Sequence, residues 1–117
     1  MQTRSSNTVK VYYPKYRRDE LIEYLSQRVG TLAQRLSLRL VMLFGSYAHG
    51  RHTAASDIDL LVVYEGVKRD DAYKIVWDTI SLKNLQPHVY NVDEWRMLGP
   101  RRWEGVVIYQ SHAEEAG

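Results

Sequence analysis

The 117-residue chain contains no cysteine. That absence excludes disulfide bonds and zinc sites built on thiolates, and it is compatible with a reducing cytoplasm. Long hydrophobic runs are also missing: the longest, residues 60–64, is far shorter than the ~20 residues that a membrane-spanning helix needs. The first eight residues are polar and contain no hydrophobic core of a secretory signal. We therefore expect a cytoplasmic protein with no membrane partner.

A strong charge of one sign is missing as well. The 16 Lys and Arg residues nearly balance the 14 Asp and Glu residues, so the formal net charge is only +2. The basic pairs are scattered along the chain: Arg17-Arg18, Lys68-Arg69 and Arg101-Arg102. Nucleic-acid-binding surfaces usually concentrate their charge more. We interpret most of these residues as solvated surface and do not expect nucleic acid as a partner.

The composition is that of a globular protein, with 44% hydrophobic and 26% charged residues. A chain of this length fits one domain. Because both ends are polar, we predict a flexible N-terminal arm over residues 1–15, a single domain over residues 16–110 and a loose C-terminal tail over residues 111–117.

The first half of the domain alternates between helical and extended patterns. Apolar residues recur at helical spacing over residues 16–36, and Gly30 is expected to kink or split this helix. The apolar segments 38–44 and 57–64 predict two buried strands. Between them, residues 45–55 are expected to form a turn followed by a short helix.

The second half continues this alternation. We predict a helix over residues 70–82 with an apolar stripe, a strand over 85–91, a short helix over 93–98 that Asp93 would cap, and a short strand over 106–109. Pro87 cannot donate a ladder hydrogen bond, so it indicates a gap or a sheet edge. The order of elements predicts an α/β (α+β) domain, in which helices cover a small sheet mainly on one face.

Two aspartates, Asp57 and Asp59, stand at the start of the second predicted strand. Side chains alternate between the two faces of a strand, so these two point the same way, about 6.6 Å apart, while Ile58 points to the core. Like charges so close repel each other unless water or a cation screens them. Mg²⁺ commonly takes one or two carboxylates together with substrate phosphate oxygens. We therefore predict that Asp57 and Asp59 are catalytic metal ligands, with a solvated strand edge as the alternative.

Gly45 and Ser46 directly follow the first predicted strand. Glycine lets the backbone approach a ligand closely, serine adds a hydroxyl donor, and the start of the expected short helix would offer free N–H groups to phosphate. A Gly-Ser pair alone is usually a plain turn. Its combination with the aspartate pair, between two apolar strands, predicts that Gly45 and Ser46 bind phosphate.

Aromatic residues near these motifs are interpreted as structural. Tyr47 is expected to pack inside the domain, with stacking on a base as the less favoured alternative. Trp77, Trp95 and Trp103 are interpreted as core or interface anchors.

The spacing of Gly45-Ser46, ten further residues and then Asp57-x-Asp59 resembles the signature of the polymerase-beta nucleotidyltransferase superfamily. Over residues 43–63 the chain is similar to the minimal nucleotidyltransferases (the MNT group), which include MntA-like antitoxin partners of HEPN proteins. The resemblance implies a mixed sheet with flanking helices and transfer of a nucleoside monophosphate from a triphosphate. It also implies one or two Mg²⁺ ions on the two aspartates, with ATP as the substrate held at Gly45 and Ser46.

In this family a third carboxylate on the next strand completes the site. Here that strand reads Leu-Gln-Pro-His-Val-Tyr over residues 85–90 and contains no Asp or Glu. Gln86 and His88 are the candidates for the third position. Gln86 can coordinate a metal through its carbonyl oxygen but carries no charge, and a histidine is a softer ligand that suits Mg²⁺ poorly. The chain therefore departs from the family at the group that helps to activate the acceptor.

Two functions follow from this pattern. The first is an enzyme that transfers AMP from ATP to a hydroxyl, which in some members of the family is a tyrosine of a partner HEPN-type toxin. The alternative is an antitoxin-like protein-binding subunit with weak or lost catalysis, because the third carboxylate is missing. A chain this short is expected to need a second chain to form its acceptor site, which leaves an oligomer open.

Overall fold

The computed structural model describes residues 17–50, 56–99 and 103–111. Their elements are, in chain order, α1 (Arg18–Ala33), β1 (Leu38–Phe44), β2 (Ile58–Tyr64), α2 (Ala72–Thr79), β3 (Leu85–Asn91), α3 (Val92–Leu98) and β4 (Gly105–Gln110). The predicted α/β (α+β) class is confirmed. The predicted arm over residues 1–15 lies outside the described residues, as does the tail after residue 111. No helix in the described part of the chain is long and apolar enough to cross a membrane.

The four strands form one mixed sheet in the order β3-β2-β1-β4. β1 is antiparallel to both β2 and β4, whereas β2 and β3 are parallel and are joined by the crossover that contains α2. β3 is an edge strand, as Pro87 predicts.

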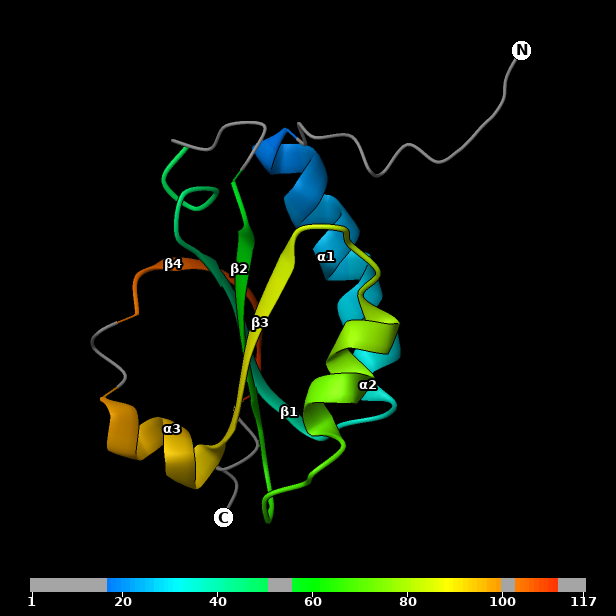
Figure 1. Cartoon of the computed structure of the whole chain (residues 1–117), viewed down its shortest axis with the longest axis vertical. Coiled ribbons are helices and arrows are strands. Elements are labelled where there is room, and N and C mark those ends of the chain that lie inside the picture. Colours follow the sequence, from blue (N-terminus) through cyan, green and yellow to red (C-terminus); the bar gives the residue numbers. More distant parts are fainter. Residues whose placement is uncertain (1–16, 51–55, 100–102, 112–117) are drawn as a thin grey trace.

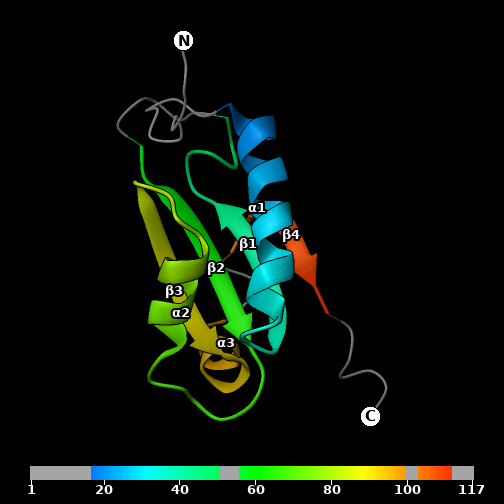
Figure 2. The same cartoon turned by 90° about the vertical axis from the view of Figure 1, so that its right-hand side faces the viewer.

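Helices α1 and α2 lie on one face of the sheet (Figures 1 and 2). The buried stripe of α1 consists of Leu21, Leu25, Val29 and Leu32. The prediction that Gly30 kinks or splits this helix is wrong: α1 continues through Gly30, which is exposed. Buried residues on both sides of the glycine hold the helix against the sheet, and that packing outweighs the low helix propensity of one exposed glycine.

Helix α2 buries the apolar stripe that its sequence predicts, which consists of Ala72, Ile75, Val76 and Thr79. Thr79 also accepts hydrogen bonds from two arginines, Arg28 in α1 and Arg35 just after α1. Nη2 of Arg28 donates to its carbonyl oxygen at 2.8 Å, and Nη1 of Arg35 donates to its hydroxyl at 2.9 Å. These bonds join the end of α2 to α1 and to the residues that follow α1.

Helix α3 lies on the opposite face of the sheet (Figure 1), over a smaller cluster that contains Leu40, Leu61 and Val63. Asn91, not Asp93, caps this helix, so that prediction is wrong. Oδ1 of Asn91 accepts from the N–H of Glu94 at 2.9 Å, and Oε1 of Glu94 accepts from the N–H of Asn91 at 3.1 Å. This reciprocal capping box satisfies two donors that would otherwise lack a partner.

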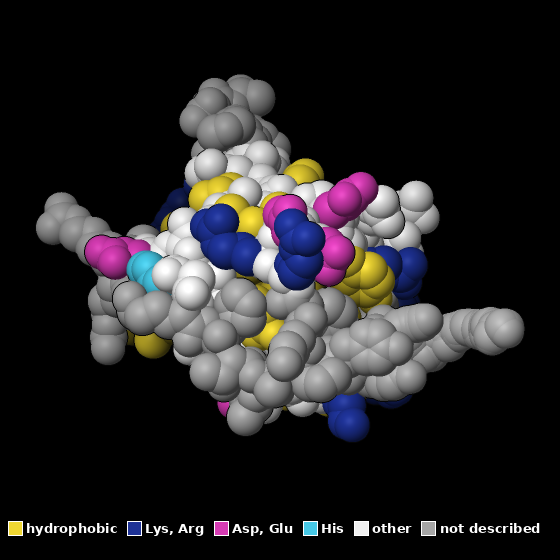
Figure 3. Space-filling view, turned by 90° about the horizontal axis from the view of Figure 1, so that it is seen from above, with side chains coloured by type: hydrophobic (Ala, Val, Ile, Leu, Met, Phe, Trp, Pro, Cys, Tyr) yellow, Lys and Arg dark blue, Asp and Glu magenta, His cyan; other side chains and the backbone are white. Residues whose placement is uncertain are grey.

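The register of the strands gathers the motif residues at one end of the sheet, where β1 ends and where β2 and β3 begin. Phe44 at the end of β1 is opposite Asp59 on one side and Gly105 on the other. Asp59 is in turn opposite Gln86 of β3. Figure 3 looks onto this end of the molecule, where basic and acidic side chains of the described residues lie next to one another.

Candidate active site

The turn that follows β1 begins at Gly45, whose φ of 80° lies in the left-handed region. The N–H groups of Ala48 and His49 donate to its carbonyl oxygen at 3.1 and 3.3 Å. Nε of Arg18, at the start of α1, donates to the carbonyl oxygen of Ala48 at 3.2 Å and holds the turn in place. The turn is therefore fixed to the first helix as well as to the sheet.

Residues 45–50 form consecutive turns, so the expected short helix is absent from this described part of the segment, and residues 51–55 lie outside the description. A second glycine of this segment, Gly50, has a φ of 72°, which also lies in the left-handed region. Phosphate binding here would consequently depend on donors of the turn. Neither the N–H nor the hydroxyl of Ser46 has a hydrogen-bond partner among the described residues.

Gly45 lies directly against the carboxylate of Asp59. A Cβ atom added to Gly45 would collide with Oδ2 of Asp59. The glycine is thus required twice, once for its positive φ and once for the space that the carboxylate occupies. This contact brings the Gly-Ser turn and the Asp-x-Asp motif into one site.

The two aspartates differ in environment. β2 begins at Ile58, so Asp57 precedes the strand and is exposed, whereas Asp59 lies within the strand with 30% of its side chain exposed. Burial raises the pKa of Asp59 above its ordinary value, and the charge of Asp57 adds to the rise, while the neighbouring His88 opposes it. The site therefore disfavours the ionised carboxylate of Asp59 unless a positive charge is near.

The two candidates for the third position both lie near Asp59 on β3. Gln86 is its direct neighbour across the parallel ladder and is exposed. Nε2 of His88 lies 3.6 Å from Oδ1 of Asp59. Among the described residues there is no group of three or more His, Cys, Asp or Glu that could hold a metal ion. Two carboxylates with substrate phosphates can still hold Mg²⁺, and the raised pKa of Asp59 fits a site that a cation would complete.

Removing the charge of Asp59 is expected to stabilise the metal-free protein. An acid whose pKa is raised on folding does not lower the free energy of unfolding at pH values below its ordinary pKa. Its destabilising effect grows as the pH rises from the ordinary pKa to the folded pKa and is complete above the folded pKa. At neutral pH in EDTA, Asp59→Asn should therefore unfold at a higher thermal midpoint than the unaltered chain. Thermal unfolding followed by circular dichroism measures this difference. An equal or lower midpoint for the variant would contradict the expectation.

Two aromatic residues lie on the same face of the sheet as Asp59, and the sequence did not indicate a function for either of them. The ring of Phe44 lies 5.0 Å from the ring of His88 and 4.7 Å from that of Trp103. Strand alternation could have placed Phe44 on the face of Asp59, but nothing in the sequence indicates that Trp103 would reach it. Tyr47, by contrast, is 1% exposed inside the main core, so its interpretation as a packing residue is confirmed.

Comparison with known proteins defines the class. Residues 18–104 match the sequence model of the nucleotidyltransferase domain family, and the chain belongs to this family. The family match and the fold of this chain are both consistent with a minimal nucleotidyltransferase. No curated protein matches the chain significantly.

Solved structures share the fold. A candidate nucleotidyltransferase from Sulfolobus solfataricus is 23% identical, with a TM-score of 0.56 over 80% of this chain and 83% of that one. A mutant of the toxin–antitoxin MntA-HpeT is 16% identical, with a TM-score of 0.53 over 78% of this chain and 77% of that one. A toxin–antitoxin crystallised with AMP-PNP has the same identity and coverage, with a TM-score of 0.49.

Proposed function

We propose that this chain transfers AMP from ATP to a hydroxyl acceptor, with Mg²⁺ held by Asp57 and Asp59 and the triphosphate held by Gly45 and Ser46. Membership of the family supports nucleotidyl transfer in general. The observation that carries the finer proposal is the packing of Gly45 against the carboxylate of Asp59. It joins a turn with free donors to a carboxylate that would be stabilised by a cation.

In the proposed reaction the acceptor oxygen forms a bond to the α-phosphorus of ATP. The bond from this phosphorus to the oxygen that bridges to the β-phosphate breaks, pyrophosphate leaves with the electron pair, and the hydroxyl proton passes to solvent. Bound Mg²⁺ would supply positive charge to the phosphate oxygens. Ser46 would orient the triphosphate through its hydroxyl and N–H, and the two aspartates would fix the cation.

The acceptor we propose is a tyrosine of a HEPN-type toxin. This part rests on the resemblance to minimal nucleotidyltransferases, and the toxin–antitoxin complex among the structural neighbours fits it. The absence of cysteine is compatible with the cytoplasmic location that we propose for this reaction. A protein acceptor also fits a small domain whose motif residues are partly exposed at one end of the sheet.

The test is to incubate the purified chain with ATP labelled on the α-phosphate, Mg²⁺ and a HEPN-type toxin as the candidate acceptor. We expect label on the partner and a partner mass raised by whole AMP units, which fragmentation would locate on a tyrosine. Absence of transfer from any of the four nucleoside triphosphates, with the chain folded, would contradict the proposal. A parallel reaction in EDTA tests the metal requirement.

The alternative is a protein-binding subunit with weak or lost catalysis. It is favoured by the occupant of the position opposite Asp59, which is the uncharged Gln86. In this case the chain would co-purify with its partner and leave the partner mass unchanged.

Restoring a carboxylate at this position separates the two functions. Gln86→Glu would place a carboxylate opposite Asp59, where it can accept the proton of the attacking hydroxyl, and general-base catalysis typically contributes 10²–10⁴-fold. We expect the rate of AMP transfer to rise by about tenfold or more. Gln110→Glu, the same change at the end of β4, is the matched control and should leave the rate unchanged. An unchanged or lower rate for Gln86→Glu would show that position 86 does not serve the reaction.

A further inference from the structure

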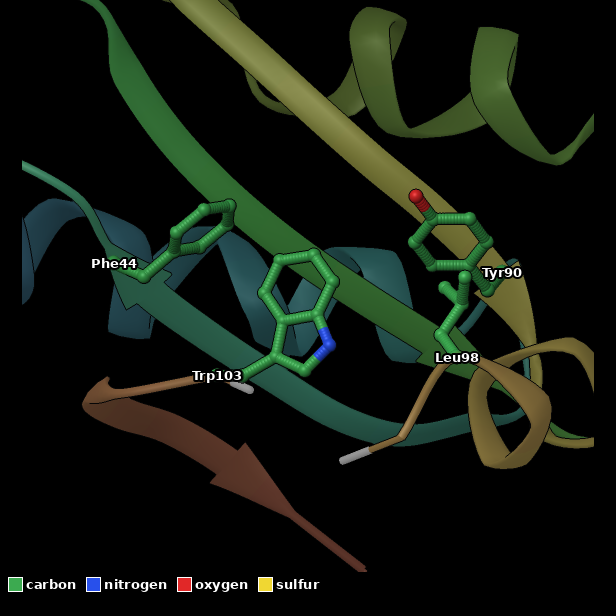
Figure 4. Close-up of a pocket in the computed structure, with 4 residues that line it drawn as sticks. All are labelled: Phe44, Tyr90, Leu98 and Trp103. Atoms are coloured by element: carbon green, nitrogen blue, oxygen red, sulfur yellow. The ribbon is translucent and has the colours of Figure 1, made fainter. Parts of the chain in front are cut away.

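A pocket of about 310 Å³ opens on the sheet face that carries α3, and it is lined by Phe44, Tyr90, Leu98 and Trp103 (Figure 4). Its walls come from the end of β1, from β3, from the end of α3 and from the residues just before β4. Three of the four side chains are aromatic. Its volume is at the lower end of the range for ligand sites, so it suits a single ring system better than a large molecule.

The pocket adjoins the motif residues. Phe44 is opposite Asp59 in the β1–β2 ladder, and side chains opposite each other lie on the same face. The rings of Phe44 and His88 are 5.0 Å apart, and His88 lies 3.6 Å from the carboxylate of Asp59. A molecule that enters the pocket would therefore be separated from the proposed reaction centre by one layer of side chains.

Trp103 contributes a polar group that lacks a partner. Its Nε1 is buried and has no hydrogen-bond partner among the described residues. In Figure 4 the indole nitrogen lies on the side of the ring that faces Tyr90 and Leu98. A buried donor without a partner destabilises a protein, and a ligand that carries an acceptor atom would remove this penalty.

The aromatic rings provide the complementary apolar surface. The ring centroid of Trp103 lies 4.7 Å from that of Phe44, with an interplanar angle of 90°, and 6.3 Å from that of Tyr90, with an angle of 60°. Aromatic side chains favour flat rings as ligands because such rings pack edge-to-face or offset against them. Tyr47 cannot serve instead, because it is 1% exposed in the core on the other side of the sheet.

We infer that this pocket receives a planar ring that carries a hydrogen-bond acceptor, which Nε1 of Trp103 binds. The inference rests on the proposed function, because the ring is the base of the nucleoside triphosphate in that reaction, and its ring nitrogens are the acceptors. The phenol ring of the acceptor tyrosine is not the occupant, because its oxygen must reach the α-phosphorus at the reaction centre.

The experiment compares Trp103→Phe, which keeps an aromatic ring but removes the indole N–H, with Trp77→Phe as the matched control. Trp77 lies on α2 and is 44% exposed. Calorimetry would measure the dissociation constants of ATP, inorganic triphosphate and tyrosinamide for each variant. Trp103→Phe is expected to raise the dissociation constant of ATP about tenfold, because the base loses the hydrogen bond from Nε1, and to leave the dissociation constant of triphosphate unchanged. A rise for tyrosinamide with none for ATP would overturn the inference.

The inference is also overturned if ATP binds the folded Trp103→Phe variant as it binds the Trp77→Phe control, or if ATP does not bind the unaltered chain. Should Trp103→Phe fail to fold, indole fluorescence of a Trp77→Phe/Trp95→Phe protein, in which Trp103 is the remaining tryptophan, decides. Quenching by adenosine, but not by triphosphate, supports the pocket, and no quenching by adenosine overturns it. These binding measurements need no turnover, so Trp103-dependent binding without AMP transfer would sustain the pocket and refute the transferase.

Discussion

Asp59→Asn is expected to lower the rate of AMP transfer by about 10³-fold. The variant keeps the size of the side chain and its packing against Gly45 but removes the charge that would hold Mg²⁺ beside the phosphates. Charge stabilisation by a bound metal contributes several kcal/mol to a phosphoryl transfer, and each ~1.4 kcal/mol is a factor of ten in rate. Asp57→Asn should cause a similar loss, although Asp57 is exposed and lies just before the strand. The measurement is the initial rate of label transfer at saturating ATP and Mg²⁺.

Asp78→Asn is the matched control for both variants. Asp78 lies on α2, where its carboxylate pairs with Lys74 at 3.0 Å, and α2 covers the opposite face of the sheet. This variant should transfer AMP at the unaltered rate. Circular dichroism must show that all three variants are folded. Near-normal transfer by folded Asp59→Asn would remove Asp59 from the metal site and leave the chemistry to other groups.

Local sequence patterns were sufficient to predict most of the elements. The strands 38–44 and 85–91 were predicted at their observed bounds, and the stripe of α2 is buried as its spacing indicates. These elements follow from hydrophobic periodicity, which depends only on near neighbours in the chain. The pattern Asn91-x-x-Glu94 also carried the signal for the α3 cap, and choosing Asp93 overlooked it.

The candidate site could be predicted only in part, because its contacts join distant segments. Sequence spacing indicated Gly45-Ser46 and the aspartate pair as motifs, but the packing of Gly45 against Asp59 depends on the β1–β2 register. Likewise, the placement of Trp103 beside Phe44 depends on the pairing of β1 with β4. A register is set by long-range pairing and packing over the whole sheet, which periodicity within one segment does not reveal.

The prediction of a short helix after β1 is wrong for residues 45–50 for a related reason. Small residues after a strand are compatible with a helix or with a chain of turns, and the positive φ of Gly45 and Gly50 decides for turns. The phosphate site then depends on individual donors such as Ser46 instead of a helix dipole. The backbone geometry at Gly45 therefore matters more here than it would in a phosphate site at the N-terminus of a helix.

Gly45→Ala is therefore expected to lower AMP transfer by about 10²-fold and to destabilise the fold by about 1–3 kcal/mol. Alanine at a φ of 80° is strained by about 1–2 kcal/mol, and its Cβ would collide with the carboxylate of Asp59. The carboxylate must move aside, and a displacement of about 1 Å in a catalytic group can cost about 10²-fold in rate. Transfer rate and the free energy of unfolding in urea are the two measurements.

Two other glycines separate the causes of this effect. Gly66→Ala shares the backbone strain, with a φ of 98°, but its Cβ would meet nothing within 4 Å. It should lose stability comparably and keep full activity. Gly30→Ala has neither strain nor contact and lies in α1, so it should gain about 0.5–1 kcal/mol. If Gly66→Ala slowed transfer as much as Gly45→Ala, the loss would reflect general destabilisation, and the contact between Gly45 and Asp59 would have no specific role in the reaction.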